Sequence, residues 1–90
     1  MNATDDPGGH RRAKAAHVHA AKVHDRAAEL HEESASFHEE HAVEMRERGR
    51  PESVERAERI AGHERELAEQ ERARGDKHRQ RAQAEPVPGD

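Results

Sequence analysis

Histidine recurs every seven residues along the first half of the chain, and this repeat limits the folds open to the chain more than any other feature. Its members are His10, His17, His24, His31 and His38. Seven residues span two turns of an α-helix, so residues with this spacing fall on one line along a helix surface. The repeat therefore predicts a long helix that carries its histidines in a single row.

The residues around the histidines predict a coiled-coil seam. The residue before each histidine is small or apolar, and over most of the repeat these residues are Ala16, Val23, Leu30 and Phe37. A second row follows four residues further along and consists of Ala20, Ala27, Ser34 and His41. If these two rows take the d and a positions of a heptad, the histidines fall on e and border the seam. A further row of small residues lies beside a: Ala21, Ala28, Ala35 and Ala42.

Glycine and proline divide the chain into two helices. No proline or glycine occurs between residues 10 and 48, where strong helix formers predominate. Gly49 is a typical helix terminator, and Pro51 is a typical first residue of a following helix. The expected segments are a flexible leader at 1–8, a helix at about 9–48, a turn at 49–51, a helix at about 52–74 with a pattern that allows extension to 84, and a flexible tail at 85–90. The predicted fold is all-α, an antiparallel helical hairpin.

A single copy of this hairpin has few bulky apolar side chains for a core. The 90-residue chain contains one phenylalanine and no tryptophan or tyrosine. Between Ala68 and residue 84 there is no bulky apolar residue, so the second helix offers little to the N-terminal half of the first. Because an amphipathic helix is stabilised mainly by burying its apolar face, we expect a second copy to cover it. The predicted assembly is a homodimer that forms a four-helix bundle or an antiparallel coiled coil.

Composition excludes several classes of function. Sixteen basic and 20 acidic residues give a net charge of −4, and the absence of cysteine excludes disulfide and thiolate chemistry. No segment approaches the roughly 20 apolar residues of a membrane span, and no signal peptide is evident, so we expect a cytoplasmic protein that does not enter a membrane. The basic run at 72–81 lacks aromatic residues for base stacking, which disfavours nucleic acid as a partner.

Histidines and glutamates near the turn form the main candidate metal site. The proposed ligands are His38, His41, Glu44, His63 and Glu66. The first three follow one another at three-residue spacing on one helix face, and a hairpin folded about Arg50 brings the other two opposite. Imidazole nitrogens together with carboxylate oxygens suit zinc, nickel, cobalt or copper(II). A weaker candidate is the pair His24 and His78, which the same fold brings together.

Known catalytic patterns are missing, so we expect no enzymatic activity. The HEEH motif at residues 38–41 is one residue shorter than the His-Glu-x-x-His spacing of zinc proteases. No histidine lies three residues after a glutamate, as di-iron bundles require. The leading hypothesis is a small protein that binds a divalent transition metal for buffering or sensing. The alternative is a structural or protein-interaction coiled coil without a ligand, in which the histidine row gives a response to pH.

Overall fold

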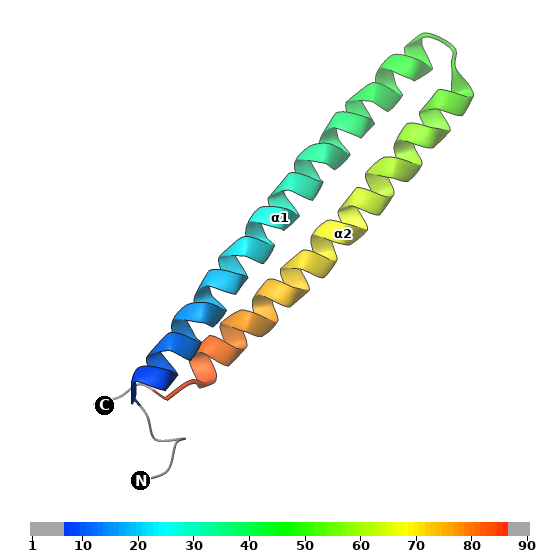
Figure 1. Cartoon of the computed structure of the whole chain (residues 1–90). Helices are drawn as coiled ribbons and strands as arrows, with labels where there is room; N and C mark the ends of the chain where they lie inside the picture. The colour runs from blue at the N-terminus through cyan, green and yellow to red at the C-terminus, as the bar shows by residue number, and fades with distance from the viewer. Residues whose placement is uncertain (1–6, 87–90) are drawn as a thin grey trace.

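The chain forms a hairpin of two long antiparallel helices in the computed structural model (Figure 1). Helix α1 spans Pro7–Glu47 and α2 spans Pro51–Ala84, so the predicted hairpin is confirmed and α2 continues without a break through Gly75. The structure describes residues 7–86, and the rest of the expected leader and tail, 1–6 and 87–90, lie outside the described residues. Within residues 7–86, neither helix contains a stretch apolar enough, over the necessary length, to cross a lipid bilayer.

A glycine cap ends α1 and sets the tight turn. Gly49 has a φ of +68°, a left-handed conformation that glycine adopts without strain. Its amide donates to the carbonyl of Arg46 at 3.1 Å, and the amide of Arg50 donates to the carbonyl of Met45 at 2.9 Å. These two bonds form a Schellman motif, which satisfies carbonyls left open at the helix end. Pro51 then begins α2 at a position where a missing amide hydrogen does no harm.

Small residues fill the seam between the helices. The buried residues of α1 are Ala21, Ala28, Ala35, Ala42 and Met45, and those of α2 are Ala57, Ala61, Ala68, Gly75 and Ala82. Most of them recur every seven residues, which is the period of a coiled coil. Because the distance between packed helices depends on the side chains at their contact, this seam brings the backbones close together. At Gly75, for example, a β-carbon would lie 3.4 Å from the carbonyl oxygen of Ala21.

The predicted seam is wrong in one respect, because the bulky apolar row of α1 faces outward. Val23 is 52% exposed, Leu30 49% and Phe37 64%. The alanines expected beside the seam occupy its centre, and the histidines expected at its border face α2. The reason lies in α2, whose seam row is alanine and glycine. Alanines pack closely against such a row, whereas large side chains would hold the two helices apart.

A row of ion pairs along one flank fixes the register of the helices. The pairs are Asp25 with Arg79, Glu32 with Arg72, Glu39 with Arg65, and Arg46 with Glu58. Each pair lies seven residues forward in α1 and seven back in α2 from the one before, and the last reverses the order of charges. A slip of one heptad would therefore bring Glu39 to Glu58 or Arg46 to Arg65. Exposed pairs each contribute only about 0.2–1 kcal/mol, so their main effect is to disfavour slipped registers.

Alanine substitutions at two glycines of α2 should separate helix propensity from packing. Gly62→Ala should raise the free energy of unfolding by about 0.5–1 kcal/mol, because alanine favours the helix and its β-carbon meets nothing within 4 Å. Gly75→Ala should gain less, because its β-carbon would lie 2.8 Å from Oδ1 of Asp25 and displace that carboxylate from Arg79. Urea denaturation measures both values. Equal stabilisation by the two variants would show that the seam has spare room at Gly75.

Candidate functional site

The histidines of the seven-residue repeat lie in the seam and face α2. Four of them place Nδ1 within hydrogen-bonding distance of a glutamate or another histidine. The pairs, here called the histidine ladder, are His10 with Glu85 at 2.9 Å, His17 with His78 at 3.0 Å, His24 with Glu71 at 2.6 Å, and His31 with Glu64 at 2.6 Å. Each partner lies seven residues earlier in the chain than the one before, and the first, Glu85, directly follows the end of α2. The repeat of α1 is thus matched by a repeat that runs the opposite way in α2.

Two ladder pairs show how half-burial makes these hydrogen bonds important. Glu71 and Glu64 keep 17% and 21% of their side-chain surface exposed, and the histidines that contact them keep 26% and 32%. A carboxylate taken partly out of water is destabilised unless donors replace the lost hydrogen bonds. An ionised carboxylate only accepts, so Nδ1–H of His24 and of His31 donates. Within residues 7–86, no buried side-chain nitrogen or oxygen lacks a hydrogen-bond partner.

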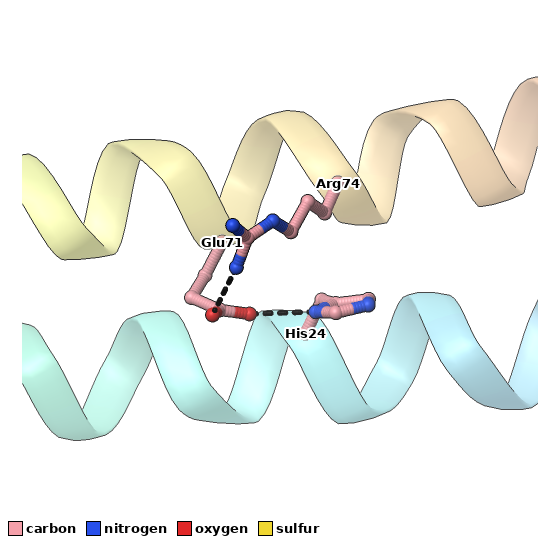
Figure 2. A network of polar contacts seen from close by, with 3 residues as sticks. All are labelled: His24, Glu71 and Arg74. Atoms are coloured by element: carbon pink, nitrogen blue, oxygen red, sulfur yellow. Dashed lines mark hydrogen bonds and ion pairs between the residues drawn. The ribbon is translucent and has the colours of Figure 1, made fainter.

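Glu71 is held from both helices (Figure 2). His24 of α1 lies 2.6 Å from one carboxylate oxygen, and Arg74 of α2 donates to the other oxygen at 3.1 Å. The hydrogen bond from His24 lowers the pKa of Glu71, burial opposes this by raising it, and the charges of His24 and Arg74 lower it further. The carboxylate of Glu71 therefore stays ionised further into acid than that of an ordinary glutamate.

One ladder pair joins two histidines. The rings of His17 and His78 lie 5.2 Å apart between centroids with a tilt of 34°, and the ring of His24 stacks on His78 at 5.4 Å and 11°. Burial, followed by the charges of His17, His24 and Arg81, lowers the pKa of His78. Adding a proton to this ring is thus less favourable in the folded chain than in the unfolded chain. A low pH therefore destabilises the contact between His17 and His78.

Towards the turn, the ladder gives way to apolar packing. One heptad after His31, the same register places His38 level with Ala57, which is buried and offers no polar group. The ring of His38 instead contacts its neighbour Phe37 edge-on, at 5.4 Å between centroids. One heptad further on, Met45 is buried. The polar part of the seam therefore lies away from the turn.

The predicted metal ligands near the turn are mostly exposed. Nδ1 of His41 lies 3.9 Å from Oε2 of Glu44, and these side chains are 44% and 62% exposed. His63 and Glu66 on α2 are exposed as well. As residues 7–86 are placed, no three histidine or acidic side chains form a group that could hold a metal ion. Metal binding by the predicted set stays a prediction.

The weaker predicted pair does lie together, since the rings of His24 and His78 are stacked. On the flank of the histidine ladder, each pairing nevertheless lies about five residues short of the position expected for a fold about Arg50. His24 meets Glu71, whereas a hairpin folded about Arg50 would bring it level with Asp76. On the opposite flank Asp25 meets Arg79, four residues beyond the position that such a fold makes level with it, so the two flanks deviate in opposite directions and the hairpin as a whole keeps the expected register.

Sequence reasoning missed the acidic partners of the histidines and the role of His17. A signal for them exists in the second half of the chain. Glu64, Glu71 and Glu85 keep one seven-residue phase, and His78 fills the remaining position. Two repeats with the same period, one of histidine and one mainly of glutamate, indicate side chains that meet across an antiparallel pair of helices.

Comparisons with known proteins add no functional residue to this site. No protein-family model matches the sequence, and no similar curated protein or solved structure was found. A function for the chain therefore has to be argued from the ladder and from the surfaces that the hairpin leaves exposed.

His78→Glu should reduce the acid sensitivity of the hairpin. Because folding lowers the pKa of His78 from 6.5, the unfolded chain binds more protons below that pH, and stability is lost as the pH falls through the folded value. In the variant, a proton on His17 would instead pair with a carboxylate. Between pH 7.5 and 5.5, Tm of the wild type should fall by a few degrees more than Tm of the variant.

His63→Glu is the matched control for this experiment, because it adds the same charge at an exposed position outside the ladder. Its Tm should depend on pH as that of the wild type does. A His78→Glu variant with the pH dependence of the wild type would contradict the assignment of acid sensitivity to the His17 and His78 pair.

Proposed function

We propose that the protein is a small non-enzymatic interaction module that forms a homodimer through an exposed apolar face of α1, and that its histidine ladder makes the hairpin responsive to pH. The exposure of large apolar side chains on α1 supports this most directly. Val23, Leu30 and Phe37 are 52%, 49% and 64% exposed. Burying a side chain of this size stabilises a protein by about 1.5–3 kcal/mol, so a partner that covers the face gains a substantial driving force.

The apolar face of α1 has the pattern of a second coiled-coil seam. It consists of Ala16, Ala20, Val23, Ala27, Leu30, Ser34 and Phe37. Successive members are alternately four and three residues apart, so they lie on one stripe of the helix. Small residues separate the large ones. In a pair of such helices, the large side chains of one copy fit over the small residues of the other.

Charges beside this face favour two antiparallel copies. Its outer border carries, in heptad steps, Arg12, His19, Arg26, Glu33, Glu40 and Glu47, all exposed. The row is basic in its first half and acidic in its second half. Antiparallel copies therefore bring opposite charges together, whereas parallel copies bring like charges together. The sign changes between Arg26 and Glu33, which places the centre of the pair beside Leu30.

The other outer surfaces offer a partner less apolar contact. One flank of the hairpin carries the row of ion pairs between acidic and arginine side chains. Ile60 of α2 is 37% exposed and, by its heptad position, lies on the opposite flank, where it widens the apolar face of α1. Val18 and Val43 are exposed away from this stripe, and single apolar side chains of this kind are common on protein surfaces. The apolar face of α1 is therefore the surface that a second copy would cover.

Divalent-metal buffering or sensing is the second candidate function. The observation that favours it is the group of imidazoles formed by His17, His24 and His78. Neutral imidazole is a good ligand for divalent transition metals. A cytoplasmic location stays a prediction under either function.

Leu30→Glu should convert the homodimer into a monomer, because it would bury a charge at the centre of the face. In sedimentation equilibrium, the wild type should have twice the mass of the 10.2 kDa chain, and the variant should have the mass of one chain. Val43→Glu is the matched control and should remain dimeric. Val43 is 50% exposed, against 49% for Leu30, but lies outside the stripe. A monomeric wild type, or a dimeric Leu30→Glu, would contradict the proposal.

Single cysteines test the orientation of the pair, because the chain has none of its own. Leu30→Cys should give a disulfide-linked dimer, since the centre of an antiparallel pair brings both copies of this residue together. Ala16→Cys should stay unlinked, because helix rise places its two copies about 40 Å apart. Non-reducing electrophoresis distinguishes the two. Cross-linking at both positions would indicate a parallel pair, and cross-linking at neither would indicate that this face makes no dimer contact.

A further inference from the structure

Three imidazoles gather where the N-terminal part of α1 meets the C-terminal part of α2. Nδ1 of His17 and Nδ1 of His78 face each other across the seam at 3.0 Å, and the ring of His24 stacks on that of His78. We propose that His17 and His78 form a two-nitrogen site for a divalent transition metal, copper(II) or nickel(II), with His24 beside it as a third imidazole. This site goes beyond the proposed dimerisation and does not depend on it.

The separation of the two nitrogens fits one coordination geometry better than another. With metal–nitrogen bonds of about 2.0–2.1 Å, nitrogens 3.0 Å apart subtend an angle of about 91–97° at the metal. This is the angle between neighbouring ligands in the square-planar or tetragonal sites of copper(II) and nickel(II). A tetrahedral zinc ion would need its nitrogens about 3.3–3.4 Å apart. The separation is therefore close to that of neighbouring ligands of copper(II) or nickel(II), for which imidazole is a suitable ligand.

The protonation state of the pair also suits a metal. Imidazole binds metal in its neutral form, and a contact between Nδ1 of His17 and Nδ1 of His78 requires that at least one of the two rings is neutral. In the metal-free pair of neutral rings, Nδ1–H of one ring donates to Nδ1 of the other. On metal binding, the donor ring carries its hydrogen on Nε2 instead, so both Nδ1 lone pairs face the metal and no net proton is released.

Two arginines near the pair repel a metal cation, and the carboxylate of Glu71 reduces this repulsion. Arg81 lies close enough to lower the pKa of His78, and Arg74 contacts Glu71 at 3.1 Å. The ionised carboxylate of Glu71 is hydrogen-bonded to His24, next to the two-nitrogen pair, and offsets part of this positive charge. Modest rotation of the imidazole rings about their last torsion, which has a broad energy minimum, aims both lone pairs at one point.

In the metal-free chain the site has two protein ligands, because residues 7–86 as placed contain no group of three possible ligands. Water, or the imidazole of His24 after it leaves Glu71, completes the coordination. Binding should therefore be weaker than that of a structural zinc site with four protein ligands. Because its two ligands come from different helices, a bound metal would join the open end of the hairpin and raise its Tm.

Isothermal titration of the full chain with copper(II), nickel(II) and zinc chlorides tests the site. The wild type should bind one copper(II) or nickel(II) ion per chain, with a smaller affinity for zinc relative to nickel. The variant with His17→Gln and His78→Gln should bind copper(II) and nickel(II) roughly tenfold or more weakly, since losing even an outer partner of a ligand weakens a metal site about 10–100-fold. The matched control carries His38→Gln and His63→Gln, removes the same number of imidazoles from the set near the turn, and should bind like the wild type.

Circular dichroism shows whether each variant keeps its helices, and copper(II) electron paramagnetic resonance of the wild type gives a readout that needs no variant. A tetragonal signal with splitting from at least two nitrogens is expected. The proposal is overturned if the signal shows one nitrogen or none, if several ions bind equally across the nine histidines, or if the control loses affinity while the His17 and His78 variant keeps it. The last result would support the set near the turn instead.

Discussion

Contact between alanine on one helix and alanine or glycine on the other is the constraint on which the rest of the structure depends. Such a contact brings two backbones close together and leaves little space for large side chains in the seam. Long polar side chains can still reach across it when their tips hydrogen-bond. Histidine of α1 and a glutamate of α2, or in one case Glu85 directly after it, do this at three of the four ladder pairs. The seam thus combines apolar contacts of small area with polar contacts that replace lost hydration, and no large apolar residue apart from Met45 is buried among the described residues.

The same constraint explains the two unlike sides of α1. Its alanine and histidine rows turn towards α2, so the heptad geometry carries Val23, Leu30 and Phe37 to the outside. Helix α1 therefore has two stripes with the same seven-residue period, of which one packs against α2 and the other is exposed. The ion pairs on the other flank disfavour slipped registers and so keep the alanine and histidine rows opposite their partners in α2. The alanine and histidine stripe thus stabilises the hairpin, while the outward apolar stripe is available to a partner.

The sequence was sufficient for the hairpin, the place of the turn and the helical character of both arms, because glycine, proline and helix-forming residues act locally. It was not sufficient to choose which stripe of α1 faces α2. Burial of apolar area favours the row with Leu30 and Phe37 when one helix is considered alone. The choice depends on the shape of the opposite helix, where Ala61, Ala68 and Gly75 accept only a close neighbour. The same limit applied to the site: the rings of His24 and His78 do lie together, whereas the partnership of His24 with Glu71 depends on which flank of the seam His24 occupies.

The regular seven-residue step of every contact along the hairpin has a consequence for its length. Removing one heptad from each arm at the same level would delete one histidine pair, one alanine contact and one flanking ion pair together, and would leave all remaining contacts in phase. Hairpins of this design can therefore grow or shrink in units of about 10 Å while their cross-section stays the same. Length becomes a property that gene duplication or deletion can tune independently of the chemistry at either end.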